Sequence, residues 1–178
     1  MNTQSIMVKH LLDLSIGTLL RYQKKWLEMY KTFKNILNKK QKNNLLKFIK
    51  QEVKNLGPVH PGLQTGSTIH LKNEMKDFNQ KIKKYIEPYK ISRSWGICSQ
   101  GDAIAWHQHL GFKYSFVYYL HSPDQVGTMF LNPTKHFNLV EYSKGIENTL
   151  IRFDGRRLHS TPNTYKKTKR YTIVFDTI

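Results

Sequence analysis

Two patterns of apolar residues divide the chain near residue 90. In residues 1–90, apolar side chains recur every three or four positions, the spacing that places them on one face of an α-helix. Three such groups predict amphipathic helices, and the apolar stretch 7–20 predicts a further packed helix. The groups are Tyr22, Trp26, Met29, Phe33, Ile36 and Leu37; Leu45, Phe48, Ile49, Val53 and Leu56; and Leu71, Met75, Phe78, Ile82 and Tyr85.

After Pro88 the pattern changes to short runs rich in β-branched and aromatic residues, separated by loops with Gly or Pro. Such closely spaced short strands predict a jelly roll with the N-terminal helices packed on one sheet. We therefore expect an α+β fold and a single domain over residues 1–178, with a helical support region at 1–90 and a β core at 91–178. The expected strands are 91–99, 103–107, 114–120, 127–131, 137–142, 149–153 and 170–176.

The composition excludes a disordered basic tail. Lys and Arg number 29 against 12 Asp and Glu, a formal charge of +17, but 39% of the residues are hydrophobic, so the chain should fold. The positive charge would attract a nucleic acid, although Lys, Ile and Asn are abundant and Ala is rare, as an AT-rich genome would impose. Charge alone therefore leaves a basic nucleic-acid-binding protein as one open alternative.

The single cysteine and the hydropathy pattern bear on the compartment. Cys98 cannot form an intrachain disulfide, and no window approaches the roughly 18 consecutive apolar residues that span a bilayer. We expect a soluble, intracellular and cytoplasmic protein with no membrane partner, and a virus-infected host cell is one compatible setting.

Three histidines of the strand half predict a metal site. His107 and His109 are two residues apart, and on a strand such residues point to the same side. His159, on another strand, is the obvious third ligand. Three ligands on one side leave the opposite coordination positions open, which suits a catalytic metal better than a structural one. Two unrelated histidines at a strand edge are the alternative.

Arg170 opens the last predicted strand and favours a site for a carboxylate. An arginine binds a carboxylate through two parallel hydrogen bonds, and Thr172, on the same face by alternation, can donate its hydroxyl to the same oxygens. Together with the histidines, this favours a dicarboxylate ligand. The alternative is a solvated arginine that ends a lysine-rich loop.

From about Trp95 to the C-terminus the sequence resembles the Fe(II)- and 2-oxoglutarate-dependent dioxygenases, whose fold is a double-stranded β-helix. Within that family it is most similar to phage and bacterial oxygenases with His-x-His in place of His-x-Asp, and around the strand core to prolyl hydroxylases. The segments that carry the resemblance are Gly101-Asp102 with Trp106 to His109, Phe116 to His121, Gly127 to Phe130, Phe153 to His159 with Pro162-Asn163, and Arg170 to Thr172.

The resemblance implies an Fe(II) site, with 2-oxoglutarate and O2 as co-substrates and His107 and His159 as iron ligands. It implies that Arg170 and Thr172 hold the distal carboxylate of 2-oxoglutarate and that Tyr119 contacts it. His109 stands where most members have a carboxylate. Either His109 is the third ligand, which we favour, or that position is vacant or filled by another residue such as Asp102.

The implied activity is hydroxylation of a protein side chain, a nucleobase or a small molecule, and the sequence identifies neither the substrate nor the oligomeric state. His121 replaces an asparagine of prolyl hydroxylases and is a candidate second-shell or substrate contact. A cupin with a three-histidine site is the nearest rival, because Gly101, His107 and His109 fit the first cupin motif. The glutamate that a cupin carries shortly after the second histidine is missing, and a cupin has no use for Arg170.

Overall fold

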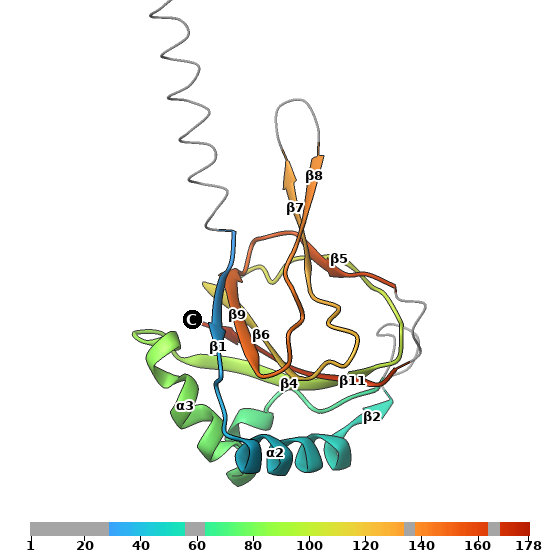
Figure 1. Cartoon of the computed structure of the whole chain (residues 1–178). Helices are drawn as coiled ribbons and strands as arrows, with labels where there is room; N and C mark the ends of the chain where they lie inside the picture. Colours follow the sequence, from blue (N-terminus) through green and yellow to red (C-terminus); the bar gives the residue numbers. More distant parts are fainter. Residues whose placement is uncertain (1–28, 56–62, 134–137, 164–167) are drawn as a thin grey trace, which may run out of the picture. The chain divides into compact units, whose positions relative to one another are not determined.

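The computed structural model describes residues 29–55, 63–133, 138–163 and 168–178, and the residues from Lys31 onward form one compact unit (Figure 1). The helix expected at residues 7–20 lies outside the described residues. The elements are β1 (Lys31–Lys34), α2 (Lys39–Glu52), β2 (Lys54–Asn55), β3 (Leu63–Gln64), the 3₁₀ helices η1 (Ile69–Leu71) and η2 (Asn73–Met75), α3 (Lys76–Ile86), β4 (Ile91–Ser99), β5 (Ile104–His107), β6 (Tyr114–His121), β7 (Met129–Pro133), β8 (Asn138–Tyr142), β9 (Thr149–Asp154), β10 (His159–Thr161) and β11 (Arg170–Thr177).

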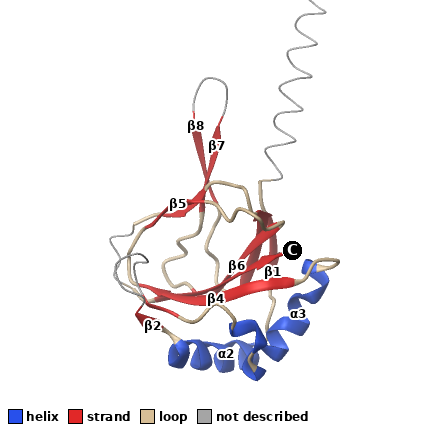
Figure 2. Cartoon of the chain, turned by 180° about the vertical axis from the view of Figure 1, so that it is seen from behind, coloured by secondary structure: helices blue, strands red, loops and turns tan. Residues whose placement is uncertain are grey.

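The strands form two antiparallel sheets (Figure 2). The larger sheet has seven strands in the order β1-β9-β6-β11-β4-β3-β2, and the smaller has four in the order β5-β10-β7-β8. Figure 1 shows α2 and α3 on the side of the large sheet that faces away from the small one. The α+β class, with helices on one sheet of a jelly roll, is thus confirmed.

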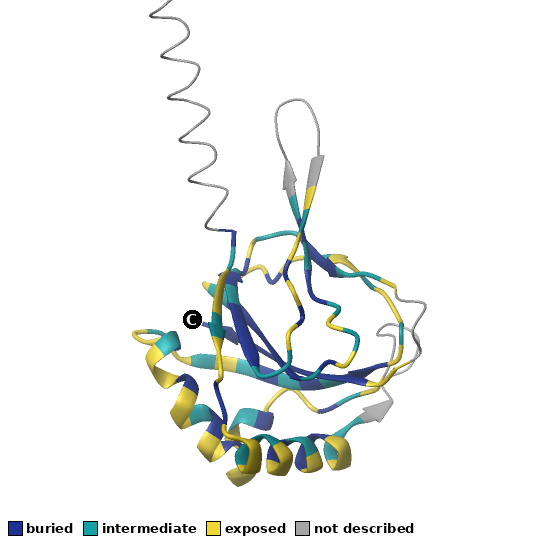
Figure 3. Cartoon of the chain, in the orientation of Figure 1, coloured by how far each residue is buried: buried dark blue, intermediate teal, exposed yellow. Residues whose placement is uncertain are grey.

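The hydrophobic core lies between the two helices and the large sheet. Figure 3 shows that the buried residues of α2 and α3 lie on the side of each helix that faces the sheet and the exposed residues on the opposite side. Asn38 begins α2 through a capping box, since its side chain accepts from the backbone N–H of Gln41 and the Gln41 side chain accepts from that of Asn38. The core residues include Leu45, Phe48, Ile49, Phe78, Ile82, Ile86, Phe116, Tyr118, Leu120, Leu150, Ile173 and Phe175.

Each of the seven expected strands matches an observed strand within two residues, and β4 has the predicted bounds. One helix prediction is wrong in the part that can be compared: the helical spacing that runs through Phe33 to Leu37 does not form a helix, because residues 31–34 are strand β1, paired antiparallel with β9. Helical spacing in so short a window also fits a strand, and the backbone hydrogen bonds to β9 decide the outcome. The short strand β10 was not expected as a separate element.

Alternation along β11 gives the large sheet two different faces. Tyr171, Ile173 and Phe175 belong to the hydrophobic core beneath the helices, whereas Arg170, Thr172 and Val174 line a cavity on the other side. The cavity lies on the side of the small sheet, so the fold places the polar residues of β11 opposite β5 and β10. Among the described residues, no helix is long and apolar enough to cross a lipid bilayer.

Candidate functional site

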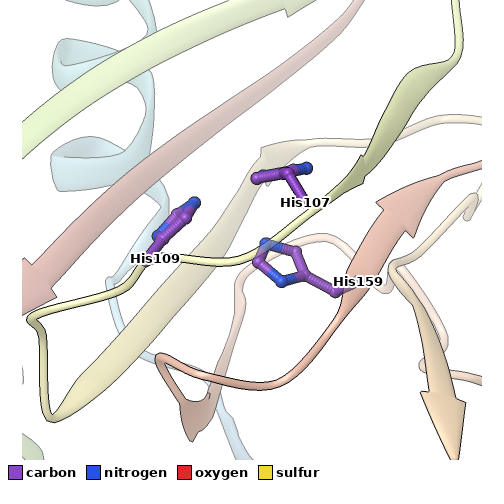
Figure 4. A group of neighbouring side chains, drawn as sticks. All are labelled: His107, His109 and His159. Carbon is purple, nitrogen blue, oxygen red and sulfur yellow. The ribbon is translucent and has the colours of Figure 1, made fainter.

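The three predicted histidines lie together at the cavity (Figure 4). His107 ends β5 and His159 begins β10, and the two residues are direct partners in the antiparallel register, with ring centroids 4.2 Å apart. The His109 ring lies 5.1 Å from that of His107 and 5.0 Å from that of His159. His109 and His159 are buried, and His107 is half-buried. In the described part of the chain, these three form the one group of neighbouring potential metal ligands.

His109 reaches this group by another route than the sequence suggests. Strand β5 ends at His107, so His109 lies in the following turn and the expectation that both occupy one strand is wrong. The backbone N–H of His109 donates to the carbonyl of Gly155 at 2.7 Å, which ties the turn to the β9–β10 connection. A Cβ at Gly155 would lie 2.9 Å from the His109 carbonyl oxygen and 2.6 Å from that of Phe112, so only glycine allows this approach.

Hydrogen bonds select the tautomer of the two paired histidines. Nδ1 of His107 lies 2.7 Å from the carbonyl oxygen of Ala105, and Nδ1 of His159 lies 2.8 Å from that of Arg157. Because a carbonyl oxygen only accepts, each Nδ1 carries the proton and each Nε2 presents a lone pair. Metal-binding histidines in proteins are held in the same way.

The third histidine is held by a buried carboxylate that the sequence analysis did not single out. Nδ1 of His109 lies 2.7 Å from Oδ1 of Asp176, which also accepts from Ser115 Oγ at 2.6 Å. Arg93 Nε donates to the other carboxylate oxygen at 2.6 Å. Burial raises the pKa of Asp176, but the bonds from His109, Ser115 and Arg93 outweigh it and hold the pKa below its ordinary value. The group is therefore an ionised acceptor, and His109 also presents Nε2.

A divalent metal fits this group. The ligand atoms of the three histidines lie within 4.8 Å of one another, and nitrogens bound to one ion at about 2.1 Å are at most about 4.2 Å apart, so a small side-chain movement brings all three onto an ion. Burial, reinforced by the nearby His107, lowers the pKa of His159 to about 3, so its imidazole is neutral at physiological pH. Neutral imidazole is the form that binds a metal.

The cavity beside the histidines has a volume of about 540 Å³, within the range of small-molecule sites. Arg170 lies in its wall with 6% of its surface exposed. One Nη donates to the carbonyl of Val126 at 2.8 Å, but the buried Nε has no hydrogen-bond partner among the described residues. Burial lowers the pKa of this guanidinium. A buried cation with an unpaired donor is stabilised by an anionic ligand, and a carboxylate of 2-oxoglutarate fits it.

Thr172 and Tyr119 line the same cavity and are direct cross-strand partners on β11 and β6. The Tyr119 hydroxyl lies 2.9 Å from Thr128 Oγ1 and 3.0 Å from Ser143 Oγ. The Tyr119 hydroxyl can donate its proton to one of these two hydroxyls and accept from the other. Thr128 also lines the cavity. It was not predicted as a site residue, because a threonine beside a glycine gives no distinctive signal in the sequence.

Two other candidate residues lie elsewhere. Asp102 is exposed, accepts a hydrogen bond from the backbone N–H of Gln100, and is not in the histidine group. His121 is not among the cavity residues, since its Nδ1 lies 3.0 Å from Oε2 of Glu147 on the protein surface. The suggested role of His121 at the site is thus wrong in its placement, because a register shift between Tyr171 and Thr172 pairs His121 with Tyr171, which belongs to the core face of the sheet.

Comparisons with solved structures define the class of fold. No family model and no curated protein matches the sequence. A prolyl hydroxylase from Trichoplax adhaerens, solved with a peptide of hypoxia inducible factor, matches with a TM-score of 0.64 at 15% identity, over 100% of this chain and 94% of that one. The epimerase SnoN of nogalamycin biosynthesis, a non-haem α-ketoglutarate-dependent protein, matches with a TM-score of 0.68 at 11% identity, over 84% and 77%.

HygX from Streptomyces hygroscopicus, solved with nickel, 2-oxoglutarate and hygromycin B, matches with a TM-score of 0.67 at 9% identity, over 88% of this chain and 86% of that one. These proteins are 2-oxoglutarate-dependent oxygenases with a double-stranded β-helix core. The present chain therefore has the double-stranded β-helix fold that the sequence predicts. At these identities the likeness concerns the fold, and the chemistry has to be argued from the site.

Proposed function

We propose that the chain is an Fe(II)- and 2-oxoglutarate-dependent dioxygenase that hydroxylates its substrate. One observation carries this proposal: three histidines whose potential ligand nitrogens lie within 4.8 Å of one another share a cavity with a buried arginine whose Nε has no hydrogen-bond partner among the described residues. A metal-binding cupin accounts for the histidines but gives the arginine no ligand. A nucleic-acid-binding protein accounts for neither.

The residues take the following roles. His107, His109 and His159 hold Fe(II) on one side and leave the opposite positions open for the co-substrate and O2. Arg170 binds the distal carboxylate of 2-oxoglutarate, Thr172 donates its hydroxyl to it, and Tyr119 contacts it. When bound, Fe(II) and 2-oxoglutarate together activate O2 to an oxidant of C–H bonds, with release of succinate and carbon dioxide. Trp95, Ile97 and Val174 form apolar walls that keep water from the reacting atoms.

The outcome of the oxidation and the substrate belong to the proposal as well. The prolyl hydroxylase, SnoN and HygX share the fold, but SnoN is an epimerase and HygX was solved with hygromycin B bound. Hydroxylation of a protein side chain, a nucleobase or a small molecule fits a cavity of about 540 Å³, since 2-oxoglutarate fills only part of it. Mass spectrometry of host protein and nucleic acid after co-expression, searching for one added oxygen atom, addresses the substrate.

The direct test is release of labelled carbon dioxide from 2-oxoglutarate in air. We expect slow release without substrate that requires Fe(II). Arg170→Ala should abolish it at low co-substrate concentration while Fe(II) binding stays within a few-fold of wild type. The matched control is Arg152→Ala, since Arg152 donates to the carbonyl of Tyr85 and is not a cavity residue. Metal-dependent turnover that ignores 2-oxoglutarate would refute the proposal and favour the cupin.

A further inference from the structure

The next-to-last residue of β11, the central and otherwise largely apolar strand of the large sheet, is an aspartate. Asp176 is fully buried, and its direct partners in the register are Arg93 on β4 and Ser115 on β6. Both partners donate to the carboxylate, Arg93 to one oxygen and Ser115 to the other, each at 2.6 Å. The register of the sheet therefore places two hydrogen-bond donors beside the carboxylate of Asp176 and stabilises its negative charge.

His109 is the third group on this carboxylate. The backbone of the β5–β6 turn carries its ring over the sheet, and Nδ1 lies 2.7 Å from Oδ1 of Asp176. The ring also lies 5.7 Å from that of Trp95, and the His109 side chain is buried. The contact thus joins a residue of the large sheet to the histidine group at the cavity.

The three histidines differ in what holds them. His107 and His159 donate to backbone carbonyls two residues before them, so the local backbone fixes their rings. His109 Nδ1 instead lies 2.7 Å from Oδ1 of Asp176, which is 67 positions away in the sequence, and 2.9 Å from Oγ of Ser115, whose own proton is donated to the same Oδ1. The side chain that holds His109 is therefore separable by mutation, whereas the backbone carbonyls are not.

We propose that Asp176 is the positioning residue of His109, holding its imidazole as the Nδ1–H tautomer with Nε2 directed at the metal. The inference rests on the proposed function in that it takes the histidine group as the metal site. A carboxylate behind a ligating histidine fixes the orientation of the ring and makes it a stronger electron donor. Most 2-oxoglutarate-dependent dioxygenases have a carboxylate as the ligand where this chain has His109. Here the carboxylate of Asp176 would instead lie behind His109, separated from the metal by the imidazole ring.

The competing account is an ion pair that only joins β4 to β11. The Arg93 guanidinium lies over the Phe112 ring at 4.2 Å and the Trp95 ring at 5.2 Å, so it has packing partners of its own. Both accounts predict that removal of Asp176 lowers stability. They differ on the imidazole of His109, and two variants separate them.

Asp176→Asn removes the charge and allows the side chain to present an N–H to His109. Arg93→Gln breaks the same ion pair but leaves the carboxylate and its bond to His109. Both proteins are prepared metal-free with ¹⁵N-labelled histidine, and the tautomer of each ring is determined by long-range ¹H–¹⁵N correlation. A His109→Gln variant assigns the His109 signals. Fe(II) affinity is then measured anaerobically, and chemical denaturation reports the stability of each variant.

We expect Nδ1–H at His109 in the wild type and in Arg93→Gln, and loss of that preference in Asp176→Asn. Fe(II) affinity should fall about 10–100-fold in Asp176→Asn and stay within about threefold in Arg93→Gln. Equal tautomer and equal affinity in the two variants would overturn the inference. If Asp176→Asn does not fold, Ser115→Ala serves instead: it removes the hydroxyl that lies 2.6 Å from Asp176 Oδ1 and 2.9 Å from His109 Nδ1 but leaves the bond between His109 and Asp176. The Nδ1–H preference must then persist, and its loss would assign the positioning role to Ser115 and contradict the proposal. A wild type that binds no Fe(II), but whose His109 tautomer depends on Asp176, refutes the proposed function and supports the positioning role.

Discussion

The two faces of the seven-stranded sheet differ in how their residues are satisfied. On the helix face, Phe116, Ile173 and Phe175 pack against α2 and α3, and the interactions are non-directional. On the cavity face, Arg170 and Asp176 each need directed hydrogen bonds. Asp176 obtains three of them within the protein, whereas Arg170 keeps an unpaired Nε.

This difference teaches which residues serve the fold and which serve a ligand. A buried polar group whose hydrogen bonds the protein supplies is held in place by the fold, and one left with an unpaired donor beside a cavity, as in Arg170, is a candidate to bind a ligand. Because side chains alternate along a strand, neighbouring residues of β11 lie on opposite faces of the sheet. Substitutions on the helix face should change stability, those of Arg170 and Thr172 should change ligand binding, and removal of Asp176 should change both.

The largest expected effect is on the helix face. Phe116 is fully buried and stacks on Phe175 with ring centroids 4.6 Å apart. Phe116→Ala should lower the free energy of unfolding by about 3–5 kcal/mol, because it leaves a cavity in the core. Urea denaturation measures this, with the exposed Leu71→Ala as control. A loss of unfolding free energy below about 1 kcal/mol would contradict the distinction between the helix face and the cavity face.

The next effect is on the cavity face. His107→Ala and His109→Ala should each weaken Fe(II) binding about 100-fold, since each removes one of three ligands. His121→Ala is the control, because His121 pairs with Glu147 away from the cavity. Anaerobic Fe(II) titration gives the affinities. Equal affinities for the His109 and His121 variants would remove His109 from the metal site.

A pair of neighbours on β11 gives the sharpest contrast. Thr172→Val should weaken 2-oxoglutarate binding about 5–10-fold, the worth of about one hydrogen bond, with little loss of stability. Ile173→Val should cost about 0.5–1.5 kcal/mol of stability and leave the affinity unchanged. Calorimetric titration and denaturation on both variants measure this. Equal effects on affinity would show that the faces are not independent.

The smallest effect concerns an ion pair on neither face. Glu147 contacts Lys42 and His121. Burial raises the pKa of Glu147, but the bonds from Lys42, Ser122 and His121 outweigh it and hold the pKa below 4.5. The stabilisation is therefore present above pH 4.5 and is lost as the pH falls through the lowered pKa. Because the group is about a third exposed, the contribution should stay below about 1 kcal/mol. Denaturation of wild type and Glu147→Gln should differ at pH 7, and the difference should shrink as the pH falls through the lowered pKa of Glu147.

The sequence predicts the β core well because its strands are short runs rich in β-branched and aromatic residues, separated by loops with Gly or Pro. β6 and β11 are buried along almost their whole length and therefore read as such runs, whereas β4 alternates between buried and more exposed positions. β1 carries no strand signal in the sequence, because most of its residues are exposed and it is held by its pairing with β9, which is distant in the sequence. Local pattern contains no information about such a partner.

The site residues His107, His159 and Arg170 could be predicted because histidine and arginine are uncommon residue types in or beside apolar strands. Asp176 was missed, although an acid in an apolar strand on the same face as Arg170 and Thr172 was a usable signal. The route of His109 depends on the approach of Gly155 and on Asp176, both distant in the sequence. Only tertiary structure brings these groups together.

The central claim is that the histidines and Arg170 bind one metal and one co-substrate together. Calorimetric titration of 2-oxoglutarate into anaerobic protein tests it directly, with and without Fe(II), for wild type and Arg170→Ala. We predict binding by the wild type that is strengthened at least tenfold by Fe(II) and is lost in Arg170→Ala. Binding that is absent, or that depends on neither the metal nor Arg170, would contradict it.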